Sequence, residues 1–240
     1  MRSIFVGTEY AGKSTLIQLL SDYYRRRHLH PHVDDHFSIP DGTLSPASRQ
    51  LMLGLPDDMK ERMQRLQIQY HVEILKRYAY PIFGGWHIEE AVYTAVYGNN
   101  PDSPYYSNYA HAFHRLYEAQ ILEARLEDVV LFHVTASDEA LVDRMRCQPH
   151  EYPITRAGDV TELKRRFADE VANSLFTFQG RTVVLDTTDK TPTQSFDELL
   201  LASDPLVSIG ELALRSLPVP DGPTEVCYRD GVRHLVPRSA

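Results

Sequence analysis

The stretch Gly7-Thr8-Glu9-Tyr10-Ala11-Gly12-Lys13-Ser14, followed by Thr15, decides the fold of this chain. It matches the pattern G-x-x-x-x-G-K-[ST] and directly follows the short apolar run Ile4-Phe5-Val6. A buried strand, a glycine-containing turn and a helix over about residues 14–27 form the context in which this pattern binds phosphate groups. We therefore expect residues 7–15 to bind a nucleoside triphosphate.

The residue types in this loop suit the binding of phosphate groups. The glycines let the backbone curl so that successive N–H groups point at phosphate oxygens. Lys13 can reach the β- and γ-phosphates, and the Ser14 hydroxyl can ligate Mg²⁺. The positive end of the following helix dipole adds to the same anion site.

The composition indicates one ordinary globular domain. The chain has 240 residues, 24% of them charged, and a net charge of −8, which argues against a protein that coats nucleic acids or anionic membranes. Cys147 and Cys227 are far apart and predict two unpaired thiols. No signal peptide and no apolar run of membrane-spanning length are visible, so a cytoplasmic location is expected.

Strands and helices are predicted to alternate along the chain. The predicted strands cover residues 4–6, 30–34, 84–90, 129–134 and 182–186. The predicted helices cover residues 14–27, 45–80 with a break at 54–57, 107–126, 139–146 and 161–175. This alternation implies a three-layer α/β/α architecture with a parallel sheet.

The predicted domain organisation follows from a change in amino-acid composition near residue 203. We expect one domain over residues 1–202 with a lid around residues 144–160, because that segment is rich in arginine and proline. Residues 203–240 are expected to form an extension that packs on the same domain, with a hairpin over residues 225–236. This extension either covers the substrate cleft or forms a homodimer contact.

Polar residues follow the predicted strands at the edge where ligands of parallel sheets bind. They are Asp34 and Asp35, Glu89 and Glu90, Arg144, Arg146 and Arg156, and Thr187 and Thr188. One acid suffices to hold Mg²⁺ and another can act as a base toward an acceptor. The alternatives stay open: each acid pair could cap or pair structurally, and the arginines could belong to a solvated surface loop.

The chain resembles the nucleoside and nucleotide kinase group of phosphate-loop proteins, which includes thymidylate, deoxynucleoside and uridine-kinase-like enzymes. The resemblance spans about residues 1–195 and rests on GTEYAGKST, DDHFSIP, WHIEEA and VDRMR, of which the first is specific. It implies a fold of the P-loop kinase type, with ATP and Mg²⁺ as cofactors.

The resemblance also implies roles for individual residues. Lys13 and Ser14 would contact the triphosphate and the metal, and Asp34 or Glu89 would also hold the metal. Asp35 would be the base or position the acceptor, and Glu89 could be the base instead. The lid cations would be Arg144, Arg146 and Arg156, and the backbone around Thr187 and Thr188 would border the purine. In thymidylate and deoxynucleoside kinases an arginine follows the acid of the third strand, whereas this chain has Glu89-Glu90. That departure favours an uncharged hydroxyl acceptor.

The leading hypothesis is therefore an ATP-dependent kinase for a small, nucleoside-like hydroxyl acceptor. A modified base in DNA, a sugar or a vitamin is also compatible, and no membrane partner is expected. The alternative is a phosphate-loop NTPase without a small-molecule acceptor, such as a GTPase-like switch or a regulatory ATPase. A guanine-reading N-K-x-D segment is missing, which argues against the switch.

Overall fold

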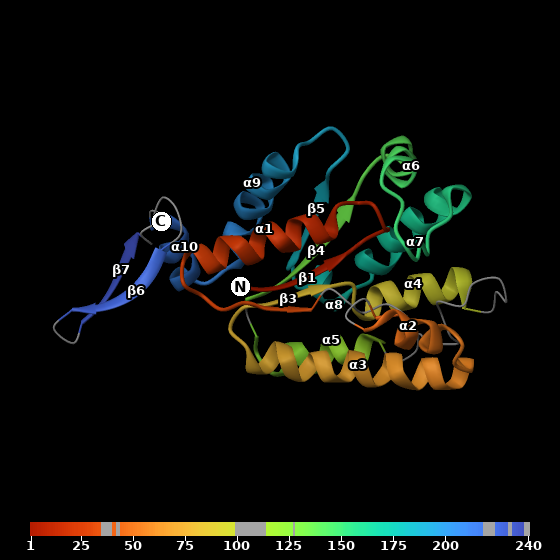
Figure 1. Ribbon diagram of the computed structural model, residues 1–240, viewed down its shortest axis with the longest axis horizontal. Helices are drawn as coiled ribbons and strands as arrows, with labels where there is room; N and C mark the ends of the chain where they lie inside the picture. Colours follow the sequence, from red (N-terminus) through yellow and green to blue (C-terminus); the bar gives the residue numbers. More distant parts are fainter. Residues whose placement is uncertain are drawn as a thin grey trace.

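A central parallel sheet organises the chain (Figure 1). The computed structural model describes residues 1–34, 40–41, 44–98, 114–126, 128–217, 224–229 and 232–237. The five strands lie in the order β2-β3-β1-β4-β5 and are β1 (Arg2–Val6), β2 (His32–Asp34), β3 (Pro81–Gly84), β4 (Val129–Thr135) and β5 (Thr182–Asp186). The predicted parallel sheet between helices is thus confirmed.

The central strand β1 explains why the core lies on both faces of the sheet. It pairs with β3 through Ser3 and Ile82, and with β4 through Ile4 and Leu131. Because side chains alternate along a strand, Ile4 packs in one core and Phe5 in the other. Such strands, apolar on both faces, are typical of parallel sheets that are covered by helices.

Helices cover each face. One core includes residues from α3 (Asp57–Arg77), α4 (His87–Tyr97), α5 (His114–Glu123), α7 (Val160–Ala172) and α8 (Leu175–Phe178). The other includes residues from α1 (Lys13–Arg26), α6 (Asp138–Cys147) and α9 (Pro192–Ser203). The short helix α2 (Pro46–Leu53) lies near α3 and α4, and η2 (Ala157–Asp159) and η3 (Asp204–Leu206) are single turns (Figure 1).

The predicted strand over residues 84–90 is wrong. β3 ends at Gly84, and α4 begins at His87, so both Glu89 and Glu90 lie in the first turn of a helix. Gly85 and Trp86 have φ angles of 92° and 83°, a left-handed backbone that ends the strand and turns the chain into the helix. Of the helix predicted over residues 107–126, residues 114–123 form α5, residues 124–126 lie beyond its end, and residues 107–113 lie outside the described residues.

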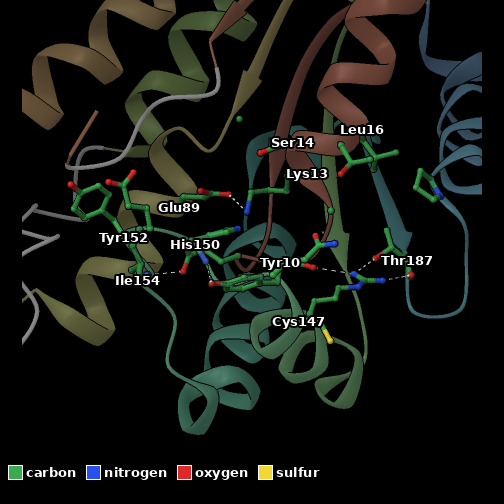
Figure 2. A pocket seen from close by; sticks show the side chains of 18 of the residues that line it. Tyr10, Lys13, Ser14, Leu16, Glu89, Cys147, His150, Tyr152, Ile154 and Thr187 are labelled. Carbon is green, nitrogen blue, oxygen red and sulfur yellow. Dashed lines mark hydrogen bonds and ion pairs between the residues drawn. The ribbon is translucent and has the colours of Figure 1, made fainter. Parts of the chain in front are cut away.

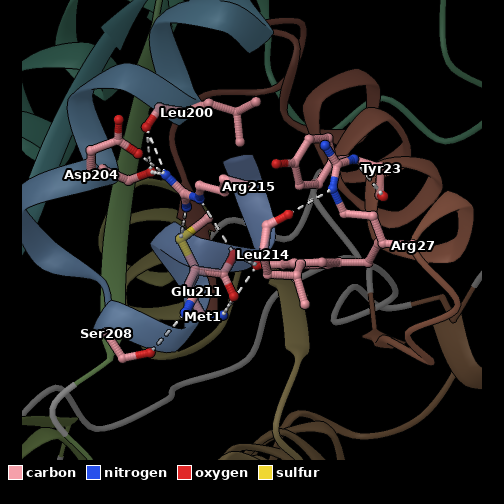
Figure 3. Close-up of polar contacts among 11 residues, drawn as sticks. Met1, Tyr23, Arg27, Leu200, Asp204, Ser208, Glu211, Leu214 and Arg215 are labelled. Atoms are coloured by element: carbon pink, nitrogen blue, oxygen red, sulfur yellow. Dashed lines mark hydrogen bonds and ion pairs between the residues drawn. The ribbon is translucent and has the colours of Figure 1, made fainter. Parts of the chain in front are cut away.

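Beyond α9, the helix α10 (Ile209–Ser216) packs against the start of the chain (Figure 3). The Glu211 carboxylate accepts hydrogen bonds from the Tyr24 hydroxyl and the Met1 amino group, both at 3.0 Å. Arg215 donates to the main-chain oxygen of Leu200 at 2.8 Å. The sequence analysis did not predict α10. These contacts join it to α1 and α9.

The predicted hairpin is confirmed as the antiparallel pair β6 (Thr224–Arg229) and β7 (Val232–Pro237). It projects from the body of the molecule on the side of α10 (Figure 1). The division at residue 203 stays a prediction. Among the described residues, no helix combines the length and the apolar character needed to cross a membrane.

Candidate functional site

A large cavity opens at the carboxyl ends of β1, β3 and β5 (Figure 2). Its volume is about 1060 Å³, at the upper end of what a single drug-sized ligand needs. Lys13 and Ser14 lie between two sides, which we name after Thr187 and Arg49 (Figure 2). The Thr187 side includes Cys147, Thr187 and Arg144, which binds Thr187, and the Arg49 side includes Glu89, Tyr152, Arg49 and its ion-pair partner Glu151. The cavity is also lined by Pro40, Gly84, Tyr93, Lys190, Pro192 and Ser195.

The loop of residues 7–14, here called the phosphate loop, has the backbone that its glycines permit. Gly7 has a φ of 146°, and a Cβ atom at this position would lie 2.0 Å from the main-chain oxygen of Val134. Gly12 has a φ of 98° and precedes the first residue of α1, Lys13. The loop therefore needs glycine at residue 7 for space as well as conformation, and at residue 12 for conformation.

The Lys13 ammonium group bridges the phosphate loop and α4. It donates to the main-chain oxygens of Gly7 at 2.7 Å and Thr8 at 3.0 Å. The Glu89 carboxylate is 3.1 Å away and forms an ion pair with it. An ammonium group has three protons, so these three acceptors can engage all of them.

The two adjacent acids, Glu89 and Glu90, have different environments. Glu89 lines the cavity beside Lys13, whereas Glu90 is buried and accepts a hydrogen bond from the Gln64 amide at 2.6 Å. Burial, and next the charge of Glu89, raise the pKa of the Glu90 carboxyl well above its usual range. Glu89 is thus the member of the pair that a ligand in the cavity can contact.

Glu9 ties the phosphate loop to residues 148–156, which we call the strap. One carboxylate oxygen accepts from the main-chain N–H groups of Ile154 and Thr155, at 2.8 and 2.6 Å. The other lies 3.0 Å from Nδ1 of His150. Burial alone would raise the pKa of the Glu9 carboxyl, but the hydrogen bonds from His150, Thr155 and Ile154 lower it below its usual value. A charged Glu9 therefore holds the strap beside the phosphate loop.

Tyr10 and Arg144 connect the phosphate loop to neighbouring segments. The rings of Tyr10 and His150 stack with centroids 4.1 Å apart. Arg144 donates to the main-chain oxygen of Tyr10 at 3.0 Å and to that of Thr187 at 2.7 Å. The arginine, predicted as a lid cation, thus joins the phosphate loop to the segment after β5.

Several predicted site residues lie away from this cavity. Asp34 lies 2.5 Å from Nε2 of His71 and is not among the lining residues. Arg146, Arg156 and Thr188 do not line the described cavity either. Arg146 pairs with Asp143, Arg156 lies over the Tyr97 ring, and the Thr188 hydroxyl accepts a hydrogen bond from the Ser137 amide. Asp35 lies outside the described residues.

The residues of the predicted lid, 144–160, belong to several elements, and the lid stays a prediction. Residues 144–147 end the helix α6, the strap follows, and η2 leads into α7 at Val160. Of the three predicted lid arginines, only Arg144 lines the cavity. The strap contacts the phosphate loop mainly through main-chain N–H groups and His150.

Arg49 and His133 are among the residues of this region that were not predicted from the sequence. Arg49 of α2 lines the cavity, although nothing in its local sequence indicates it. His133 of β4 pairs in register with Val6, the last residue of β1 before the phosphate loop. Burial, and next the charge of Lys13, lower the pKa of His133 to about 4, so it is neutral at pH 7. Only its place within an apolar strand signals His133.

The residues present fit Mg²⁺. The Ser14 hydroxyl is exposed and lines the cavity, and the Glu89 carboxylate lines it too. Among the described residues, no cluster of three or more His, Cys, Asp or Glu side chains could form an all-protein metal cage. Mg²⁺ instead prefers one or two protein ligands with waters and phosphate oxygens, which this hydroxyl and carboxylate could complete.

A phosphate loop after β1 and the strand order 2-3-1-4-5 together give this chain the P-loop kinase fold. Solved structures with this fold that resemble the chain include nucleoside and nucleotide kinases. A comparison with protein-family models gives no match, and neither does one with curated protein sequences.

Three solved structures illustrate the likeness. The YorR protein from Bacillus subtilis, in complex with phosphorylated GDP, is 14% identical over 91% of this chain and 100% of its own, with a TM-score of 0.54. Deoxyadenosine kinase from M. mycoides is 13% identical over 84% of this chain and 97% of its own, with a TM-score of 0.54. Thymidylate kinase from Candida albicans is 14% identical over 85% of this chain and 91% of its own, with a TM-score of 0.56. At such identities the likeness establishes the fold alone.

Proposed function

We propose that this chain is an ATP-dependent phosphotransferase that moves the γ-phosphate, with Mg²⁺, to a small nucleoside- or nucleotide-like acceptor. The observation that carries the proposal is the continuous cavity on both sides of Lys13. A nucleotide bound along the phosphate loop would occupy the Thr187 side, so that the Arg49 side remains for a second substrate. A switch or regulatory ATPase needs no such second space.

Lys13 would stabilise the charge that develops on the transferred phosphate. Its contacts with Gly7 and Thr8 keep the ammonium group at the phosphate loop, where phosphate oxygens can replace main-chain oxygens as acceptors. Such preorganised positive charge is typically the largest contribution to phosphoryl transfer. The Tyr10 and Thr187 segments, held together by Arg144, would border the purine.

Glu89 can serve the reaction in two ways, both of which the geometry allows. With Ser14 it could hold Mg²⁺, which when bound would neutralise charge on the phosphate oxygens. It could instead accept the proton of the attacking group, because it lies on the Arg49 side next to Lys13. The strap would limit the access of water to the phosphate loop.

The test is acceptor-dependent release of ADP. The protein is incubated with ATP and Mg²⁺ and a panel of nucleosides, nucleotides, sugars and vitamins, and ADP is measured with and without each acceptor. ADP that depends on one class of acceptor supports the kinase. Hydrolysis that no acceptor accelerates, or binding of GTP alone, would instead support the NTPase alternative.

A further inference from the structure

The Arg49 side of the cavity contains an arginine whose ion-pair partner among the described residues is largely exposed. Arg49 reaches the cavity from α2, and its side chain is only 16% exposed. Its ion-pair partner is Glu151 of the strap, at 3.0 Å, and that carboxylate is 66% exposed. Arg49 also lies over the Tyr152 ring, at 5.3 Å from its centroid. An ion pair with so exposed a partner contributes little to stability.

The guanidinium group of Arg49 also has spare donor capacity. Its Nε atom is buried and has no hydrogen-bond partner within the part of the chain that the structure describes. Guanidinium groups bind phosphate and carboxylate groups through two parallel hydrogen bonds, often with Nε as one of the donors. The single bond from Nη1 to Glu151 leaves that second position unused.

Two other cations that line the cavity, Lys13 and Arg144, are more fully engaged than Arg49. Lys13 contacts two main-chain oxygens and Glu89. Arg144 binds the main-chain oxygens of Tyr10 and Thr187. Lys190 pairs with Glu198 outside the cavity lining. Of these cations, Arg49 is the one whose acid partner a ligand could replace with least loss.

We propose that Arg49 binds an anionic group of the acceptor, a phosphate or a carboxylate, and that Glu151 occupies this position as an internal competitor. This inference rests on the proposed function and names the acceptor class for it. It differs from the uncharged acceptor that the sequence favours, because Glu89-Glu90 lacks a following arginine but α2 supplies one from elsewhere in the chain. Tyr152 also lines the cavity, and its ring offers apolar surface to the rest of the molecule.

Two substitutions should have opposite effects on binding. Arg49→Gln removes the charge and should weaken binding of an anionic acceptor by about tenfold or more. Glu151→Gln removes the competitor and should tighten the same binding by about two- to fivefold. A merely structural ion pair predicts that both substitutions act in the same direction.

The experiment measures ligand binding by calorimetry with the phosphate loop filled by a non-hydrolysable ATP analogue and Mg²⁺. Ligands are compared in pairs that differ in one anionic group: thymidine and its 5′-monophosphate, adenosine and its 5′-monophosphate, glucose and glucose 6-phosphate, glucose and glucuronate. The matched control is Arg165→Gln, which removes an exposed arginine that is paired with Glu162 on α7. Thermal melting verifies that each variant is folded.

We expect at least one anionic member to bind about tenfold more tightly than its neutral partner, and that preference to vanish in Arg49→Gln but persist in Arg165→Gln. The phosphate and sugar-acid pairs distinguish the two anion types. If no anionic ligand binds more tightly to the wild type than to Arg49→Gln, the proposal is overturned, whether or not neutral ligands bind. Failure of the ATP analogue to bind refutes the proposed function separately.

Discussion

Removing the Glu9 side chain should release the strap from the phosphate loop. The Glu9 carboxylate accepts hydrogen bonds from the main-chain N–H groups of Ile154 and Thr155, and both of these residues are buried. In Glu9→Ala the two N–H groups lose their acceptor. We expect the strap to detach while the five-stranded sheet remains folded, because the sheet has its own core on both faces.

The magnitude follows from the number of bonds lost. A buried donor without a partner costs about 1–3 kcal/mol, and two are affected, so Glu9→Ala should cost about 2–4 kcal/mol after part of the strap reaches water. Glu9→Gln keeps an acceptor oxygen but replaces charge-assisted bonds by neutral ones, which are about half as strong. Its cost should be about 1–2 kcal/mol. Glu73→Ala, an exposed control on α3, should change stability by less than about 0.5 kcal/mol.

The effect of pH has a defined sign. Because the pKa of folded Glu9 lies below the ordinary value of 4.5, its ionised form stabilises the folded state. This contribution is fully present above the ordinary pKa and is lost as the pH falls through the lower, folded pKa. The difference in unfolding free energy between wild type and Glu9→Gln should therefore be constant from about pH 7 to pH 5.5 and shrink below about pH 4.5.

The assay combines urea unfolding with hydrogen exchange of the strap amides. We expect the amides of Ile154 and Thr155 to exchange faster in both variants than in the wild type, at pH 7. Equal exchange in the wild type and in Glu9→Ala would refute the conclusion that this carboxylate holds the strap. A stability loss without faster exchange in the strap would refute it as well.

Three further results are expected from single substitutions. Gly7→Ala should abolish nucleotide binding and destabilise the fold more than Gly12→Ala. A Cβ at Gly7 would lie 2.0 Å from the Val134 oxygen, whereas a Cβ at Gly12 would lie 3.9 Å from the Thr187 side chain. Titration with ATP and urea unfolding test this, and equal losses in the two variants would contradict it. Glu118→Gln should cost about 3–5 kcal/mol at pH 7, since its buried, ionised carboxyl, with a pKa of about 2, supports several buried donors. Glu90→Gln should cost less than Glu118→Gln, because burial, and next the charge of Glu89, raise the pKa of Glu90 and so disfavour its charged form; a cost as large as that of Glu118→Gln, measured by urea unfolding, would contradict this.

Much of the fold could be predicted because short sequence patterns, such as glycine positions and apolar runs, indicate its elements. The phosphate loop needs glycine at Gly7 and Gly12, whose φ angles are positive. The run over residues 129–134 is apolar and buried, and the run over residues 182–186 contains the apolar residues Val183, Val184 and Leu185, so both predict strands. The turn at Gly85-Trp86 could not be predicted, because a tryptophan with a φ of 83° violates the preference of its residue type. Burial of Trp86 and its hydrogen bond to the Ile68 oxygen stabilise that turn, and both depend on tertiary contacts.

The cavity was only partly predictable for a similar reason. Lys13, Ser14 and Glu89 belong to elements next to the sheet edge, and the parallel topology brings them together. Glu9 and Ile154, by contrast, are 145 positions apart, and Arg49 enters from α2, a short helix that precedes α3 between β2 and β3. No local pattern indicates such contacts, because they depend on how the strap and α2 pack over the phosphate loop.

The central claim is that the phosphate loop and Lys13 bind a nucleoside triphosphate. Its most direct test is calorimetric titration of ATP with Mg²⁺ into the wild type and into Lys13→Ala, with thermal melting to verify that both are folded. We predict one molecule of ATP bound by the wild type and an affinity at least about tenfold lower in the variant. Absence of binding to the wild type, or equal affinity in the two proteins, would contradict the claim.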